Sequence, residues 1–275
     1  MKANSGVSRL YPSHIQAKAS AGEKLVALTA YDYFSALIAE SAEADVILVG
    51  DSLGTVIAGR RDTLSVSLEQ MIYHSEIVSR VSQHALVVGD MPFMSYQASP
   101  EDGVRSAGAL IQQGGVGAVK LEGGVRHKEI IERIVRAEIP VMGHIGLTPQ
   151  SVNRMGGYKV QGKTNSTGVS SREAIIEDAK AVEEAGAFAV VVEGVPELLG
   201  KELSELLTIP TIGIGAGRYC DGQILVMHDL LGLNGSNVPK FVKKYLEGFE
   251  LCQKAVASYA DEVRSGQFPG PENVY

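Results

Sequence analysis

The sequence predicts an α/β protein, a (β/α)8 TIM barrel that forms a single domain. Eight short apolar runs, rich in Val, Ile and Leu without strict alternation, are typical of parallel strands covered on both faces. Helical patterns lie between these runs, and such alternation indicates a parallel sheet. Nearly every run ends in a residue that can take part in chemistry, and barrel enzymes carry their active sites at these strand ends. The length of 275 residues suits one barrel.

The predicted strands are residues 25–29, 46–50, 86–89, 118–121, 140–143, 188–192, 209–214 and 224–227. Ser67, Ser99 and Ser171 are predicted helix N-caps, and Pro100 suits the first helical position. We expect one domain over residues 1–275, with an N-terminal extension, one or two helices within 241–263, and a Pro/Gly-rich tail over 266–275.

Composition excludes several classes of function. The net charge is -7 and no Lys/Arg cluster occurs, so nucleic acid and anionic membranes are not expected partners. No apolar run approaches the roughly 18 residues of a membrane span. Residues 1–6 lack a signal-type apolar stretch, and Cys220 and Cys252 form no C-x-x-C pair. These features predict a cytoplasmic protein.

Two connections are longer than simple strand-to-helix turns need. They cover residues 53–66 and 147–170. Long loops at the functional end of a barrel usually cover or line the site. We expect the second loop, which follows His144, to be a lid, although mere decoration of the fold is the alternative.

Four carboxylates end different predicted strands: Asp51, Asp90, Glu122 and Glu193. In a closed barrel they converge, and their mutual repulsion would be relieved by a divalent cation. Oxygen ligands favour a hard ion such as Mg²⁺, without excluding Mn²⁺ or Co²⁺. Helix capping explains one Asp, but it explains four carboxylates at equivalent places poorly.

Lys120 and His144 are the other candidate site residues. Lys120 lies two positions before Glu122, so both side chains point to the same face of a strand. It could hold a substrate carboxylate, form a Schiff base, or pair with a neighbouring acid. His144 lies between glycines that leave room for a ligand, although a structural role is about as well supported. The glycines at 213, 215 and 217 resemble a phosphate cradle, or make space for a bulky planar cosubstrate.

Several long motifs closely resemble the ketopantoate hydroxymethyltransferase family. They are VGDSLG (49–54), DMPFMSY (90–96), VKLEGG (119–124), GHIGLTPQS (143–151), GGYKVQG (156–162), IGIGAG (212–217) and 221–229. The resemblance runs in order from about residue 25 to residue 229.

The resemblance implies transfer of a one-carbon unit from 5,10-methylenetetrahydrofolate to 3-methyl-2-oxobutanoate, through a Mg²⁺-stabilised enolate, to give 2-dehydropantoate for pantothenate synthesis. It implies that Asp51, Asp90 and Glu122 surround Mg²⁺, the last through water. It also implies that Asp51, Ser52, Asp90, Lys120 and His144 bind the keto acid, and that Glu193 is the catalytic base. The family is homo-oligomeric, commonly decameric.

Two other functions compete. A lyase or mutase of the phosphoenolpyruvate mutase and isocitrate lyase type would also bind Mg²⁺ and an enolate, but it needs a Cys in a mobile loop, and neither Cys220 nor Cys252 has that context. A non-catalytic barrel would have no need for four costly carboxylates together with Lys120 and His144.

Overall fold

The computed structural model describes residues 9–163, 165, 167–235 and 238–275, which form two compact units, 1–226 and 227–275. The first eight residues of the expected N-terminal extension, and residues 164 and 166 of the expected lid, lie outside the described part of the chain. Within the described residues, every helix is too short or too polar to cross a lipid bilayer.

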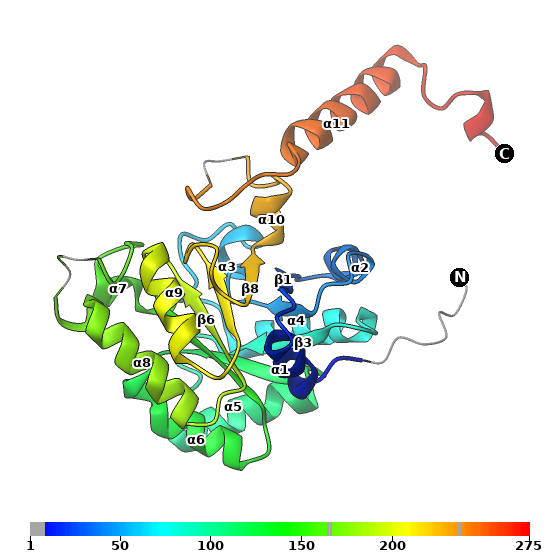
Figure 1. The fold of residues 1–275 in the computed structure, drawn as a ribbon. Helices are drawn as coiled ribbons and strands as arrows, with labels where there is room; N and C mark the ends of the chain where they lie inside the picture. The colour runs from blue at the N-terminus through cyan, green and yellow to red at the C-terminus, as the bar shows by residue number, and fades with distance from the viewer. Residues whose placement is uncertain (1–8, 164, 166, 236–237) are drawn as a thin grey trace. The chain divides into compact units, whose positions relative to one another are not determined.

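The first unit is a closed barrel of eight parallel strands in sequence order, which confirms the predicted fold class (Figure 1). The strands are β1 (Leu25–Thr29), β2 (Val46–Val49), β3 (Leu86–Asp90), β4 (Ala118–Glu122), β5 (Val141–Gly146), β6 (Ala189–Glu193), β7 (Thr211–Ile214) and β8 (Gly222–Leu225). The barrel closes where β8 pairs with β1, with Leu25 opposite Gly222. All eight predicted strands are present, shifted at their ends by a few residues.

Helices cover the outside of this barrel: α2 (Tyr33–Ser41), α4 (Leu68–Val81), α5 (Pro100–Gln112), α6 (Lys128–Arg136), α8 (Arg172–Glu184) and α9 (Glu197–Leu206). Ser67, Ser99 and Ser171 accept the backbone N–H three residues on, so the three predicted N-caps are confirmed. Residues 215–221 connect β7 to β8 without a helix.

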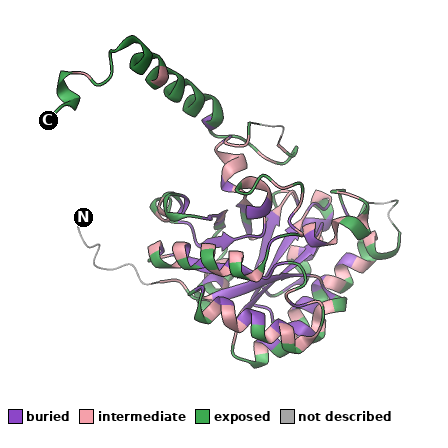
Figure 2. Cartoon of the chain, turned by 180° about the vertical axis from the view of Figure 1, so that it is seen from behind, coloured by how far each residue is buried: buried purple, intermediate pink, exposed green. Residues whose placement is uncertain are grey.

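The strands are buried almost throughout, whereas the helices are exposed on their outer faces (Figure 2). Side chains on alternate strand positions fill the barrel interior. Helix α1 (Pro12–Ser20) contributes Ile15 to the same apolar cluster, beside Leu25, Leu86 and Phe188 at the strand starts. The N-terminal segment therefore packs against the amino ends of the strands and leaves their carboxyl ends open for a site.

Both long loops contain short helices that the sequence did not predict. These are α3 (Leu53–Val56), η2 (Pro149–Ser151), α7 (Val152–Met155) and η3 (Gly168–Ser170); η1 (Val125–His127) follows β4. One-turn helices with Gly and β-branched residues have little intrinsic propensity, so tertiary contacts hold them.

The second unit holds α10 (Met227–Leu230), α11 (Gly248–Ser265) and η4 (Pro271–Asn273). One helix, α11, lies in the stretch 241–263 where one or two were expected. It begins only at Gly248, and the N–H groups of Tyr245 and Gly248 bond to the carbonyls of Leu230 and Leu231. The backbone of this stretch is therefore committed to the turn around α10 before α11 begins.

Candidate active site

The candidate site is the last layer of the barrel interior. Strand side chains two positions apart point to the same side. Four core residues are each followed, two positions on, by a candidate: Val88 by Asp90, Ala118 by Lys120, Met142 by His144, and Val191 by Glu193. The same alternation that fills the core with apolar side chains therefore points these ionisable groups inward at the carboxyl ends of the strands.

Asp51, Asp90 and Lys120 form one side of this layer. Asp90 and Lys120 are register partners on β3 and β4, and Lys120 Nζ lies 2.9 Å from Asp90 Oδ1. The backbone N–H of Asp51, just beyond β2, donates to Asp90 Oδ2 at 3.0 Å. Lys120 is thus paired with an acid, which was one of the three roles that the sequence left open.

Glu122, His144 and Glu193 form the other side. Lys120 Nζ lies 3.1 Å from His144 Nδ1, and His144 Nε2 lies 3.1 Å from Glu193 Oε2. An ammonium group has only donors, so Nδ1 accepts and the neutral ring carries its proton on Nε2, the atom that faces Glu193. Glu122 Oε1 lies 3.7 Å from His144 Nδ1. The histidine therefore links the lysine to the glutamate across the barrel mouth.

Burial and mutual charge shift the protonation of these groups strongly. Burial and the Asp90 carboxylate raise the pKa of Asp51 to about 7. Burial also raises the pKa of Glu122 well above its usual range. Burial by itself would lower the pKa of Lys120, but the carboxylates of Asp90, Glu122 and Asp51 outweigh it and raise that pKa. A charged ammonium is no nucleophile, so the structure disfavours the Schiff base.

Glu193 and His144 have the properties of a base and its neighbour. Burial raises the pKa of Glu193 to about 7, while its side chain stays 15% exposed. Burial and Lys120 hold the pKa of His144 well below its ordinary value, so the ring is neutral. A carboxyl group with a pKa near the working pH can take and return a proton efficiently.

Gln150 is a site residue that the sequence reasoning missed. Its side-chain Nε2 donates to Asp51 Oδ2 and to the Met91 carbonyl, both at 2.9 Å. Its backbone N–H donates to Glu122 Oε2 at 2.9 Å, and its Oε1 accepts from the Tyr96 hydroxyl at 2.9 Å. Only the motif 143–151 drew attention to this position, because a polar residue after a helix-initiating Pro resembles an ordinary loop residue.

Replacing Gln150 by Ala is expected to lower the free energy of unfolding by about 1–3 kcal/mol, because it leaves buried acceptors on Asp51 and Met91 without a donor. Thermal denaturation of the purified protein measures this change. Gln112→Ala, at an exposed position of α5, is the matched control and should change little. Equal stability of the two variants would show that the Gln150 amide does not hold Asp51.

Ser52 is placed beside the cluster. Its hydroxyl is 2.8 Å from the Tyr31 hydroxyl, at the start of α3. Among the described residues, its side chain makes no hydrogen bond to the other six predicted residues, although it directly follows Asp51 in the chain. The glycines at 213–217 are explained in part by packing, since a Cβ at Gly217 would lie 2.4 Å from Glu197 Cγ on α9.

The donors suit a hard divalent cation in chemistry and charge. Glu122 Oε1 is buried without a hydrogen-bond partner among the described residues, and burial, followed by the nearby Asp90 carboxylate, raises the pKa of Asp51. Carboxylate oxygens are the ligands that Mg²⁺ prefers. However, no three His, Cys, Asp or Glu side chains of the described chain are arranged to hold a metal ion. The expected three-ligand set is thus not preformed, because Lys120 occupies one side of Asp90.

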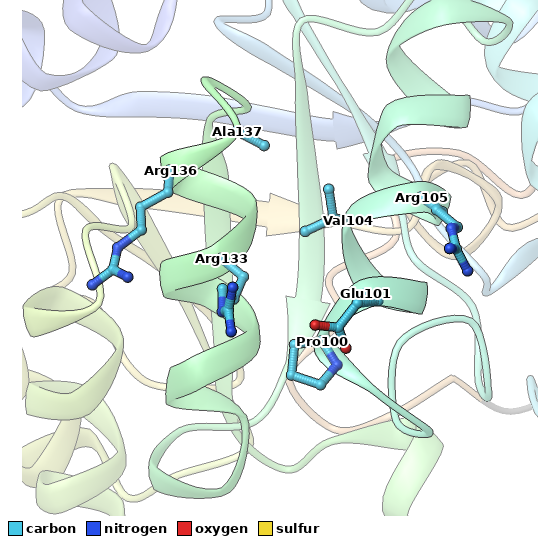
Figure 3. Close-up of a pocket in the computed structure, with 7 residues that line it drawn as sticks. All are labelled: Pro100, Glu101, Val104, Arg105, Arg133, Arg136 and Ala137. Atoms are coloured by element: carbon cyan, nitrogen blue, oxygen red, sulfur yellow. The ribbon is translucent and has the colours of Figure 1, made fainter.

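A cavity of about 570 Å³ adjoins the cluster and shares Glu122, Gly146 and Gln150 with it. Its other walls come from the loops after β4 and β5 and from α8. A second hollow, of about 420 Å³, lies outside the barrel between α5 and α6 (Figure 3). The first cavity is the one that meets the ionisable layer.

A barrel gains nothing structurally from burying four acids and a lysine at one end of its strands. Their presence at the carboxyl ends, where this fold carries out chemistry, defines the class of protein: a (β/α)8-barrel enzyme. The sequence comparisons then specify which one. The chain belongs to the ketopantoate hydroxymethyltransferase family, whose profile matches residues 9–271.

Relatives named 3-methyl-2-oxobutanoate hydroxymethyltransferase support this membership. The Clostridium kluyveri protein is 57% identical over 250 residues, covering 91% of this chain and 88% of the relative. The Enterococcus faecalis protein is 56% identical over 251 residues, with 91% and 90% covered. The Carboxydothermus hydrogenoformans protein is 51% identical over 263 residues, with 96% and 94% covered.

Solved structures share the fold at low sequence identity. Phosphonopyruvate hydrolase in complex with oxalate and Mg²⁺ superposes with a TM-score of 0.62 at 11% identity, covering 96% of this chain and 93% of that one. A 2,3-dimethylmalate lyase of the PEP mutase/isocitrate lyase superfamily gives 0.58 at 17% identity, with 92% and 98% covered. These likenesses establish the barrel and no more.

Proposed function

We propose that this enzyme transfers a hydroxymethyl group from 5,10-methylenetetrahydrofolate to 3-methyl-2-oxobutanoate, giving 2-dehydropantoate for pantothenate synthesis. The observation that carries the proposal is Glu193, a carboxyl group with a pKa of about 7 at the mouth of the barrel. It lies one histidine away from a buried ammonium that suits a keto acid. The names of the relatives supply the substrate.

In this proposal the substrate binds through the opposite side of the layer. Lys120 neutralises the substrate carboxylate, Ser52 donates a hydroxyl hydrogen bond, and Asp51 and Asp90 border the keto oxygen. His144 lines the same pocket, with its Nε2 atom 3.1 Å from Glu193 Oε2. Glu193 then takes the proton from C3, leaving an enolate of the keto acid.

A bound divalent cation would supply Lewis-acid polarisation of the keto group, which lowers the cost of removing a C3 proton. Asp51 and Asp90 are the residues that would hold it, with Glu122 reaching it through water. Their oxygen donors and their excess negative charge support Mg²⁺ over softer ions.

Carbon–carbon bond formation completes the proposed reaction. The C3 proton passes to Glu193, and C3 bonds to the one-carbon unit of the donor. Both bonds from that carbon to the folate nitrogens break, and one water supplies the hydroxyl group. The remaining water proton and the C3 proton complete the two nitrogens of the departing tetrahydrofolate. We propose that the loop over 147–170 acts as a lid that keeps other water away from the reactive carbon.

The test mixes the keto acid, Mg²⁺ and 5,10-methylenetetrahydrofolate with the protein and detects 2-dehydropantoate by mass spectrometry. Product should form only when all three are present. Product without the folate, or with the folate but at the uncatalysed rate, would contradict the proposed donor.

The metal assignment has its own test. Asp51→Asn and Asp90→Asn should each weaken Mg²⁺ binding more than about tenfold, since even outer-shell partners of metal ligands contribute at least that much. Isothermal calorimetry on the protein without keto acid measures the affinity. Glu193→Gln, which lies on the other side of the layer, is the matched control and should bind Mg²⁺ normally. Unchanged affinity in both Asp variants would refute the assignment.

Family membership removes the mutase or lyase alternative, and the positions of the cysteines agree. Cys220 lies buried between β7 and β8, and its carbonyl accepts a hydrogen bond from Lys24. Cys252 lies on α11. Neither thiol lies in the long loops after β2 or β5. The two free cysteines also support a cytoplasmic location.

We propose that this enzyme is a homo-oligomer, and its family leads us to expect a decamer. Helix α11 presents an apolar stripe at heptad spacing, and its members are all exposed: Phe249, Cys252, Val256, Tyr259 and Val263. Exposed apolar surface of this kind usually marks an interface. Light scattering gives the mass in solution, and a monomer at assay concentration would contradict this part of the proposal.

A further inference from the structure

Two arginines line the cavity beside the active site, and neither has a hydrogen-bond or ion-pair partner in the described part of the chain. Arg126 lies in η1 after β4, and Arg154 lies in α7 after β5. Among the residues that the structure describes, neither guanidinium group makes a hydrogen bond or an ion pair. Most surface arginines of this chain do have such partners, for example Arg218 with Glu197 at 2.7 Å.

The two arginines repel each other. Both line the same cavity, and burial together with the like charge of Arg126 lowers the pKa of Arg154. Asp178 of α8 is the acid near both, but its Oδ1 accepts the N–H of Val125 at 2.9 Å, and burial raises its pKa. The guanidinium groups of Arg126 and Arg154 therefore make no hydrogen bond or ion pair with a described side chain, although Glu177 and Asp178 also line the cavity.

The rest of the cavity suits a flat, largely apolar molecule. Phe93, Ile145, Met155 and Ile175 contribute apolar walls, and Glu122 and Gln150 of the active site line the same cavity. Forked guanidiniums bind carboxylates bidentately. The cavity therefore combines two unpaired guanidiniums, apolar walls and contact with the candidate active site.

The hollow between α5 and α6 shows that this arrangement is specific. Three arginines line it as well, but Arg105 contacts Asp102 at 3.7 Å and Arg133 contacts Glu129 at 4.0 Å. Arg105 and Arg136 extend in opposite directions (Figure 3). No paired, unpartnered guanidiniums converge there.

We propose that the cavity beside the active site binds the one-carbon donor, with Arg126 and Arg154 holding the glutamate carboxylates of its tail and the reactive ring placed toward Glu122 and Gln150. This inference rests on the proposed function for the identity of the donor. The shared chemistry is a carboxylate, which a tail or a separate small acid could supply, and the test distinguishes the two.

The test uses Arg126→Ala, Arg154→Ala and the double variant. Each lost charged hydrogen-bond pair should weaken tetrahydrofolate binding about tenfold or more, measured by calorimetry. The KM for the donor should rise similarly, while the KM for the keto acid and its C3 deuterium exchange stay unchanged. Arg126→Lys with Arg154→Lys should recover part of the affinity. Arg136→Ala, on α6, is the matched control.

A donor without any carboxylate, the amide of 5,10-methylenetetrahydropteroate, decides the source of the carboxylate. If the arginines hold the tail, this compound should bind wild type and double variant equally. If the variants lose activation or inhibition by an added small carboxylic acid but bind the full donor normally, the tail assignment is overturned. Normal donor binding in wild type and variants alike, with product formed, overturns this inference and leaves the proposed function standing. If the variants lose tetrahydrofolate binding while the wild type forms no product, the arginine site is supported and the proposed function is contradicted. If the double variant also loses keto-acid exchange, the single Ala variants and the Lys double variant show whether donor binding is weakened while this exchange is kept.

Discussion

Replacing Glu193 by Gln is expected to slow deuterium exchange at C3 of the keto acid by about 10²–10⁴-fold, because the amide cannot accept the proton. The substitution keeps the shape of the side chain and its position 3.1 Å from His144 Nε2. Exchange is followed by NMR without the folate, so that proton removal is measured apart from carbon transfer. Near-normal exchange in the variant would exclude Glu193 as the base.

The pH dependence gives an independent signature. Only the ionised carboxylate accepts a proton, and the pKa of Glu193 is about 7. The exchange rate of wild type should therefore rise about tenfold per pH unit below pH 7 and level off above it. The Glu193→Gln variant should lose this inflection. A wild-type profile that is flat between pH 5 and pH 8 would contradict the assignment.

Replacing Lys120 by Met is expected to raise the KM for the keto acid more than it lowers kcat, because the variant removes a ground-state partner of the substrate carboxylate. Methionine retains the apolar stem, so the change is mainly one of charge. Steady-state kinetics separates the two constants. An effect confined to kcat would assign Lys120 to the transition state instead.

The same variant should be less stable. Lys120 is buried against Asp90 at 2.9 Å, and removing one partner of a buried pair typically costs about 3–5 kcal/mol. Lys128→Met, which breaks an exposed contact with Glu184 on the helices, is the matched control and should unfold at nearly the wild-type temperature. Equal melting temperatures for the two variants would show that the buried pair does not stabilise the fold.

The sequence predicted most of the fold, because the signals for the strands and helices of a barrel are local. Most strands are short buried runs rich in Val, Ile and Leu, and three of the main helices, α4, α5 and α8, begin at a Ser that accepts the backbone N–H three residues on. It did not predict the one-turn helices α3 and α7, whose residues have little intrinsic helix propensity.

The site shows the same division. Position at a strand end identified Asp51, Asp90, Glu122 and Glu193 as neighbours, and the structure does bring them into one layer. It could not show that Lys120 would lie against Asp90, or that His144 would join Lys120 to Glu193, because those contacts depend on register between strands. Gln150 and the pair Arg126 and Arg154 carry no local pattern at all.

The amino-acid sequence by itself determined the eight-stranded barrel, the end of the barrel that carries the reactive groups, and the family, because strand runs, capping residues and long motifs are local features of the chain. The tertiary structure alone decided the protonation states and the contacts of the ionisable side chains. Protonation, tautomer and hydrogen-bond partner depend on burial and on distances of a few ångströms between residues that are far apart in the chain.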